Sequence, residues 1–390
     1  MTPVPTFPRT RATWLSYLML AYYGYFLNIF GPITPFLKNE LQLSYTVSSL
    51  HFSAFALGMI GAGLTGHRVI QRLGRWNSLW LGAFGMCVSA ILLIVGRDPK
   101  LTIGASFLMG LVGSLILAII PSVLSDQYGE MRAVAFSEAN VISSIVSAVA
   151  PVLVGWFATM ALGWRAALLI PVLAALVIRF GFGTVALPTA QVSTTTTAST
   201  GRLPRLYWIY WVALVMGVSI EFCMIFWSAD YLETVLKIPK ADAAQAVSLF
   251  LAGMIVGRLS SSRLVQRFNP HQVVTGSLLI AATGFLIYWT ATAPIFGIVG
   301  LFVTGLGVAG LYPMILSLAI GTAGGSIDRA SALGSLASGT AIFLLPLILG
   351  RLADAAGIRA AYAVIIVLLI VAFAIIRGTA RSIAKPQIDV

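Results

Sequence analysis

Long stretches without a charged residue recur along the chain, separated by short segments that carry Arg, Lys, Asp or Glu. No charged residue occurs from Ala12 to Leu37, from Leu41 to His67, from Trp76 to Gly96 or from Leu101 to Ser125. A membrane-spanning helix needs roughly 20 predominantly apolar residues, because a charge in the hydrocarbon core is expensive. The pattern therefore predicts a series of membrane-spanning helices.

Twelve such helices are predicted, and they account for nearly the whole chain. No stretch alternates apolar and polar residues as the strands of a membrane barrel do, so the predicted fold class is an all-α membrane protein. The predicted spans are 12–37, 45–66, 76–96, 101–124, 133–160, 166–186, 206–229, 242–262, 272–292, 295–322, 331–352 and 360–377.

Composition agrees with the pattern and excludes a soluble protein. Hydrophobic residues make up 59% of the 390 residues and charged residues 9%, with a mean hydropathy of +0.96, whereas soluble domains carry about 25% charged residues. If the N-terminus is cytoplasmic, sixteen Lys and Arg residues face the cytoplasm and eight face the other side. This asymmetry predicts a multi-pass protein of the cell inner membrane with both termini cytoplasmic. The net charge of +12 then reflects topology and not nucleic-acid binding.

The second half of the sequence repeats the first at a fixed offset of 195 residues. Ser53–Ile60 lies over Ser248–Ile255, and Gly155 lies over Gly350. We expect two pseudo-symmetric six-helix bundles, 1–187 and 206–390, joined by a cytoplasmic linker, 188–205, that is rich in Thr, Ser and Ala. Parallel repeats of this kind hold a substrate site near the membrane midplane, between two halves that rock against each other.

The segment Gly66–Arg75, GHRVIQRLGR, lies between the second and third predicted helices. It resembles the signature loop of the major facilitator superfamily, Gly-x-x-x-Asp-Arg-x-Gly-Arg. It departs from that loop at two points, because Gln71 replaces the acidic residue and Gly66 stands one position early. In the second copy Asn269 takes the place of Gly74. The resemblance implies a bacterial secondary transporter with twelve spans that works by alternating access and is usually a monomer.

In that family the basic residues of the loop latch the inner ends of the helices, often through an acid at the end of the fourth helix. The resemblance therefore implies an Arg75–Asp126 pair. The alternative is a positively charged cytoplasmic loop with no specific partner. The inner gate implied by the family consists of Gly66, Gln71, Arg72, Gly74, Arg75 and Asp126.

Glu221 lies well inside the seventh predicted helix, and an ionisable residue at membrane depth indicates a functional role. Because burial in an apolar medium favours the neutral form of a carboxyl group, Glu221 is a candidate for proton exchange during transport. The alternative is a neutral acid that bonds a neighbouring helix. Glu138, two turns into the fifth helix, is a second candidate for proton coupling. Its alternative is a structural pairing with Arg132 or with the inner latch.

Polar side chains recur along the two pseudo-symmetric helices, the fifth and the eleventh. Such stripes suggest a wetted passage, although Ser also serves helix packing. Aromatic and polar residues near the middle of the first and seventh helices add to them, and under the 195-residue shift Tyr22 is expected to face Glu221 across a cavity. The candidate substrate-binding residues are Tyr22, Tyr25, Asn28, Asn140, Ser144, Trp227, Ser228, Ser335 and Ser338.

The sequence contains no motif for a metal site, a nucleotide site or a catalytic site. The three histidines do not cluster with Cys or carboxylates at metal-ligand spacing, so no metal or other cofactor is expected. No nucleotide-binding loop or catalytic motif occurs, which argues against an enzyme and against ATP as the driving force. Arg258 is interpreted as a snorkelling residue near the inner end of its helix. Without a deep cationic residue, a neutral or cationic solute is favoured over an anion.

The sequence therefore predicts a secondary transporter that moves a small organic solute, coupled to protons or another ion. Of the glycine-rich motif that drug antiporters carry in the fifth helix, only Pro151 and Gly155 remain. This favours uptake by symport over efflux of drugs or metabolites. A receptor or lipid-handling protein on a transporter scaffold is the alternative from another functional class. The expected partners are the solute, the coupling ion and the lipid bilayer, and the expected state is a monomer.

Overall fold

The computed structural model describes residues 8–188, 203–323 and 326–384, and this part of the chain is helical without a strand. The predicted linker 188–205 falls almost wholly outside the described residues. The first half contains α1 (Arg11–Glu40), α2 (Tyr45–Val95), α3 (Pro99–Tyr128), the 3₁₀ turn Gly129–Met131, α4 (Arg132–Ala158) and α5 (Ala166–Phe182). The second half contains α6 (Arg205–Leu236), α7 (Lys240–Leu264), α8 (Pro270–Thr290), α9 (Pro294–Val308), α10 (Leu311–Gly321), α11 (Ile327–Ala356), α12 (Ile358–Ala361) and α13 (Ala363–Ala384).

Several helices begin where short polar residues can bind free backbone N–H groups. Ser44 accepts a hydrogen bond from the Val47 N–H at the start of α2, and Asp98 accepts one from Lys100 at the start of α3. Proline follows the cap in α3, where its missing N–H costs nothing. These local signals set the ends of the helices.

The structure differs from the predicted spans at three places. α2 consists of two helices that meet at a kink, and the first of them continues through residues 67–73, which were expected as part of the loop between the second and third spans. Its bend is at Gly74, whose φ of 78° and ψ of 162° suit a residue without a Cβ. The tenth span is divided into α9 and α10 around Ala309 and Gly310, and the twelfth is divided into α12 and α13.

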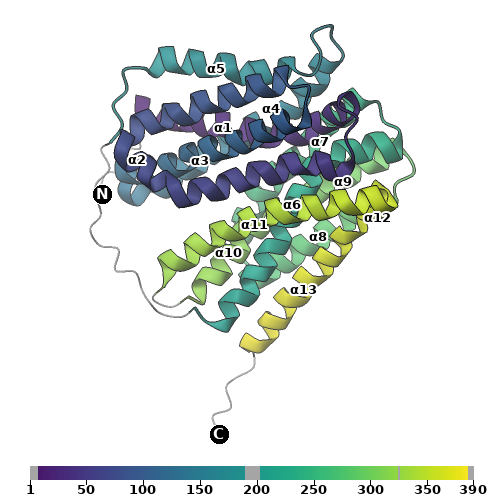
Figure 1. The fold of residues 1–390 in the computed structure, drawn as a ribbon. Coiled ribbons are helices and arrows are strands. Elements are labelled where there is room, and N and C mark those ends of the chain that lie inside the picture. Colours follow the sequence, from purple (N-terminus) through teal and green to yellow (C-terminus); the bar gives the residue numbers. More distant parts are fainter. Residues whose placement is uncertain (1–7, 189–202, 324–325, 385–390) are drawn as a thin grey trace.

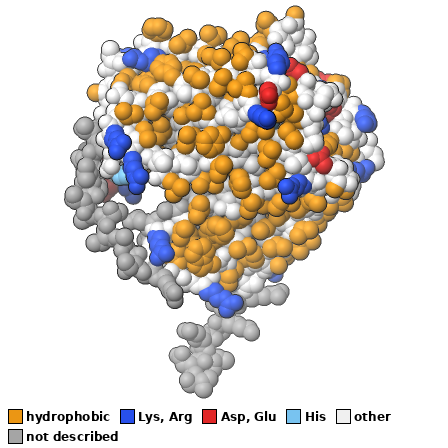
Figure 2. All heavy atoms as spheres, viewed as in Figure 1, with side chains coloured by type: hydrophobic (Ala, Val, Ile, Leu, Met, Phe, Trp, Pro, Cys, Tyr) orange, Lys and Arg blue, Asp and Glu red, His pale blue; other side chains and the backbone are white. Residues whose placement is uncertain are grey.

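An apolar belt surrounds the molecule. Eight described helical stretches are long and apolar enough to cross a membrane, and two of these, 45–95 and 99–158, have the length of two crossings each. Together with α1 and the shorter apolar α5, they match the twelve predicted spans. Figure 2 shows hydrophobic side chains over the middle of the visible face and Lys and Arg side chains toward its two ends. Exposed apolar residues of the belt include Leu81, Val88, Ile91, Val141, Ile145, Leu173, Val177, Leu279, Leu286, Val367 and Ile370.

The sequence repeat reappears in how helices pack. A Cβ placed on Gly58 would lie 2.2 Å from the carbonyl oxygen of Phe107, and one on Gly253 would lie 2.3 Å from that of Phe302. Both pairs are related by the 195-residue shift, as are Gly110 with Phe55 and Gly305 with Phe250. Missing side chains therefore let α2 approach α3, and α7 approach α9, to backbone contact.

The two halves meet at one end of the molecule and diverge toward the other (Figure 1). We call the end with Arg11 and Arg205 the terminal end, and the end with Glu40 and Leu236 the far end. At the far end Gly155 of α4 packs on Ala241 of α7. The pseudo-symmetric contact joins Gly350 of α11 to Tyr45 of α2. Toward the terminal end, side chains of helices from both halves are exposed, among them Leu64, Ser137, Asn140, Arg258, Ser335 and Leu336. The structure is therefore closed at the far end.

Candidate functional site

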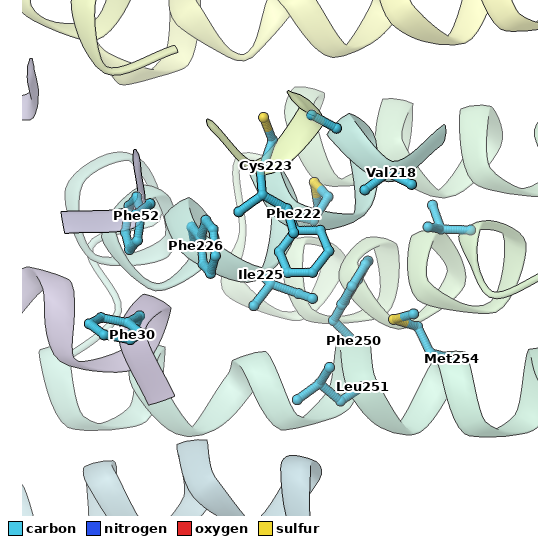
Figure 3. Packing of buried hydrophobic residues seen from close by; sticks show 14 of the residues in the cluster. Phe30, Phe52, Val218, Phe222, Cys223, Ile225, Phe226, Phe250, Leu251 and Met254 are labelled. Atoms are coloured by element: carbon cyan, nitrogen blue, oxygen red, sulfur yellow. The ribbon is translucent and has the colours of Figure 1, made fainter. Parts of the chain in front are cut away.

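Glu221 lies near the middle of α6, as expected, and its side chain is 15% exposed. Its neighbours Val218, Phe222 and Ile225 are buried apolar residues (Figure 3). One carboxylate oxygen, Oε1, lies 3.7 Å from a guanidinium nitrogen of Arg258. The acid found from the sequence thus has a cationic partner at the same depth.

The position of Arg258 corrects the interpretation of this residue as a snorkelling side chain. Its side chain is 46% exposed, and instead of extending to the membrane surface it turns toward Glu221. A second guanidinium nitrogen donates a hydrogen bond of 3.1 Å to the hydroxyl of Ser144 on α4. Because Ser144 belongs to the first half and Arg258 to the second, this side chain connects the two halves.

The rotation of α7 explains why Arg258 reaches this site. A Cβ on Gly257 would lie 2.3 Å from the carbonyl oxygen of Leu306, so one face of α7 is held against α9. The side chain that follows Gly257 therefore points to a different face, where α6 and α4 lie. Sequence reasoning missed the pair because depth along one helix does not tell which helix its side chain faces. The signal available was an arginine directly after a glycine, more than one turn before the end of its helix.

Glu221 and Arg258 form a pair of opposite charges that links α6 to α7. Because the Arg258 side chain is 46% exposed, water weakens their attraction. When the carboxylate binds a proton, the guanidinium loses its counter-charge and keeps the hydrogen bond to Ser144 as its remaining polar contact among those described. Protonation at one atom therefore changes the contacts of a residue that joins the two halves.

The polar stripe of α4 divides between two roles. Ser137 and Asn140 are exposed, and Ser144 bonds Arg258. Ser147 is buried, with its hydroxyl packed against Gly24 of α1. On α11, Ser335 is exposed and Ser338 is half-buried. The exposed members have accessible hydroxyl and amide groups, whereas Ser147 serves packing.

The polar residues of α1 lie differently from expectation. The hydroxyl of Tyr22 donates to the carbonyl of Ala83, so Tyr22 points at α2 and not across a cavity at Glu221. Tyr25 donates to the carbonyl of Ala167, and Asn28 to that of Gly24. All three are buried. The 195-residue shift aligns positions along the two helices but does not set how each helix is rotated in its bundle.

Trp227 and Ser228 are fully buried near the far end. The indole of Trp227 donates to the carbonyl of Pro346, and its ring packs edge-on against Phe52 of α2. Phe52 in turn stacks on Phe226 with ring centroids 4.1 Å apart (Figure 3). We call Phe52, Phe226 and Trp227 the aromatic plug, because they fill the interface between the halves.

Glu138 lies at the terminal end, where it pairs with Arg9 and not with Arg132 or the inner latch, the partners named in its structural alternative. Its carboxylate is 2.6 Å from the Arg9 guanidinium and accepts a hydrogen bond of 3.0 Å from the hydroxyl of Tyr17. Trp14 and Ser137 join these residues around a hollow of about 450 Å³. In this conformation Glu138 ties the start of the described chain to α4.

The ion pair that the family resemblance implied is present. A guanidinium nitrogen of Arg75 lies 2.6 Å from the carboxylate of Asp126 and also donates to the carbonyl of Pro188. The pair joins the bend of α2 to the end of α3 within the first half. Gly66 packs on Leu115, whereas Gln71 and Arg72 are exposed.

The residues that the structure describes form no candidate metal site. Within 8–188, 203–323 and 326–384 no group of three or more His, Cys, Asp or Glu side chains is arranged to hold a metal ion. His51 bonds Thr102, and His271 bonds Tyr210, each inside its own half.

The chain matches the profile of the Major Facilitator Superfamily over residues 16–272 and 209–387. A glucose/galactose transporter of Brucella abortus is 27% identical over 376 residues, which cover 88% of each chain. An uncharacterised MFS-type transporter of Yersinia pestis is 27% identical over 99 residues, and this match spans 25% of the present chain and 26% of the Yersinia protein.

Solved structures agree on the fold. A D-xylose–proton symporter superposes with a TM-score of 0.72 at 14% sequence identity, covering 96% of its own chain and 94% of this one. At this identity the likeness concerns the arrangement of helices alone.

Proposed function

This chain belongs to the Major Facilitator Superfamily of transporters, and we propose that it carries a small neutral solute together with a proton, with Glu221 as the proton-binding group. It is a transporter and not an enzyme. The observation that carries the proposal is the 3.7 Å approach of Glu221 to Arg258, which itself bonds Ser144 of the other half.

Proton coupling needs a group whose protonation changes how the two halves interact. The Glu221–Arg258–Ser144 cluster meets this requirement, because a neutral Glu221 no longer holds Arg258. Glu138 lacks this connection, since Arg9, Tyr17 and Glu138 all belong to the first half. We therefore assign the coupling role to Glu221 and a structural role to Glu138.

The substrate class follows from charge and from exposed polar groups. The sequence argument that favoured a neutral or cationic solute over an anion depended on there being no deep cation, and Arg258 removes that premise. Glu221 balances Arg258, so the site is near neutral and offers hydroxyl and amide groups from Ser137, Asn140 and Ser335. These groups suit a solute rich in hydroxyls, and the similarity to a glucose/galactose transporter supports this class.

The remaining parts of the proposal concern topology and assembly. We propose that 1–187 and 206–390 move as two bodies joined by 188–205, in a monomer of the inner membrane with both termini cytoplasmic. The structure then represents a state closed to the outside. The Arg75–Asp126 pair would hold α2 to α3 while the first half moves as a unit.

The test uses purified protein in liposomes that enclose a pH-sensitive dye, with a panel of monosaccharides, amines and organic acids outside. A solute that drives proton entry identifies the substrate. Glu221→Gln is expected to abolish uphill accumulation while retaining exchange of labelled for unlabelled solute, because binding and rocking survive without the proton.

Glu138→Gln is the matched control and is expected to keep coupled accumulation. Uphill accumulation by Glu221→Gln at the parent level would refute the coupling role of Glu221. Proton flux driven by amines or organic acids, and by no monosaccharide, would refute the substrate class.

A further inference from the structure

A charge pair joins the two halves at the far end. The ammonium nitrogen of Lys38, on the last turns of α1, lies 2.5 Å from a carboxylate oxygen of Asp230 on α6. The Asp230 side chain is 0% exposed and that of Lys38 is 13% exposed. This pair is distinct from the Glu221 cluster and was not among the residues singled out from the sequence.

The Lys38–Asp230 pair lies against an aromatic side chain. The Lys38 ammonium lies 3.9 Å from the centroid of the Tyr45 ring. The second carboxylate oxygen of Asp230, Oδ2, has no hydrogen-bond partner among the described residues. One helical turn before Asp230 lies Phe226 of the aromatic plug. Lys38 is thus the main group that compensates the charge of Asp230.

A second carboxylate of the same half contacts the first half at this end. Asp354 of α11 accepts hydrogen bonds of 2.8 Å from the backbone N–H groups of Tyr45 and Thr46, at the start of α2. These N–H groups have no partner within their own helix, and the positive end of the helix dipole favours an anion there. Both acids of the second half therefore attract positive groups of the first.

A buried ion pair gains attraction but loses the hydration of both charges, and the two effects are of similar size. When the halves separate at the far end, both charges return to water. A contact of this kind stabilises the closed state, but the free-energy cost of opening stays small. This balance suits a contact that must form and break in every transport cycle.

We propose that Lys38 and Asp230 are the lock of the far gate, which must separate before the outer side opens. The proposal depends on the chain being an alternating-access transporter and is independent of Glu221, of the coupling ion and of the substrate. It predicts that the single and double substitutions at the pair change the opening of the far end in opposite directions. Without Lys38 the buried Asp230 carboxyl must either bind a proton or reach water, and both destabilise the closed state, whereas removing both charges leaves nothing to compensate and favours closure.

The test measures access to the far interface with a reporter cysteine. Ser49 is buried on α2 and packs against Gly350 of α11, so Ser49→Cys reports separation of the halves. Cys87 and Cys223 are first replaced by alanine. The protein in liposomes or whole cells is then labelled with a membrane-impermeant maleimide added to the outer side.

Lys38→Met is expected to raise the labelling rate at least tenfold. Asp230→Asn is expected to raise it less, because Lys38 lies close enough to the edge to reach water. The double variant Lys38→Met/Asp230→Asn is expected to return to the parent rate or below. Glu40→Gln is the matched control, since Glu40 pairs with Arg165 and Arg97 at the same end but within the first half, and it should leave the rate unchanged.

An unchanged rate in Lys38→Met, with thermal stability like that of the parent, would overturn the proposal. Equal rates in Lys38→Met and the double variant would also overturn it, because charge pairing would then not explain opening. Asp230→Asn provides an independent measurement if Lys38→Met does not fold. No solute or proton gradient enters this assay, so its failure and the failure of the Glu221 proposal are separate results.

Discussion

The side chain of Arg258 contacts both halves of the molecule. Its guanidinium lies near Glu221 of its own half and donates to Ser144 of the other half. A planar guanidinium has several donors in fixed directions, so it can hold both partners at once, which a lysine ammonium does less well. The chemistry of the proposed site therefore depends on Arg258 as much as on the acid.

Arg258→Met is expected to abolish uphill solute accumulation while exchange of labelled solute continues. Without the guanidinium, Glu221 has no cation in contact and stays protonated in its apolar surroundings. Accumulation ratios in liposomes with an imposed proton gradient measure the effect. Ser144→Ala removes one hydrogen bond of the same cluster, worth about 1 kcal/mol, so accumulation should fall only a few-fold, less than in Arg258→Met. Accumulation by Arg258→Met equal to the parent would contradict the expectation.

At the scale of elements, close packing depends on glycine. Gly58 and Gly110 let α2 and α3 touch through their backbones, and Gly253 and Gly305 do the same for α7 and α9. Interfaces between membrane helices gain stability from such contact, because no hydrophobic effect draws helices together in lipid. Each half thus contains a helix pair whose separation is set by the absence of side chains.

Gly58→Val is expected to lower the thermal unfolding temperature in detergent, and Gly253→Val should lower it by a similar amount. The added Cβ would lie 2.2–2.3 Å from a carbonyl oxygen, so the helices must move apart, at a cost of about 1–3 kcal/mol. Gly63→Ala on the same helix is the comparison, since nothing lies within 4 Å of its Cβ position. Equal unfolding temperatures for all three variants would show that these contacts do not limit stability.

The sequence located the helices well and their rotations poorly. Runs without charge predicted twelve spans, and charges at the ends of the runs marked most boundaries. The extension of the second span through residues 67–73 was missed because polar residues alone do not end a helix, and the break comes only at Gly74. Glu221 was found because it is an acid in mid-span. Its partner Arg258 and the direction of Tyr22 depend on how α7 and α1 are turned against their neighbours, which local sequence does not specify.

At the scale of the whole molecule, the interface between the halves combines symmetric packing with asymmetric charge. Gly155 and Gly350 are equivalent under the repeat, and their contacts Ala241 and Tyr45 lie one residue away from equivalent positions. The charges are not equivalent, because Thr159 stands where the other half has Asp354, and Pro35 stands where it has Asp230. At the far end, close backbone packing occurs in both copies of the repeat, whereas the acids Asp230 and Asp354 occur in the second copy only.

Joining the halves covalently at the far end is expected to stop transport. A Cβ on Gly350 would lie 3.0 Å from that of Ser49, so Ser49→Cys/Gly350→Cys should form a disulfide after a small separation of the helices. Solute uptake in liposomes should fall to the level of empty vesicles on oxidation and recover with dithiothreitol. The single variants are controls. Full activity of the oxidised double variant would mean that the far end need not open.

The glycine contacts also bear on how such a sequence can diverge. A large side chain in a core can be exchanged if a neighbour changes to compensate, but a carbonyl oxygen has no smaller version. Positions 58, 110, 253 and 305 each face such an oxygen. Drift at these four positions is therefore limited to the smallest residues, while the lipid-facing surface varies freely. In an alignment of relatives, the similarity between the two halves of the sequence should therefore be greatest at these four positions.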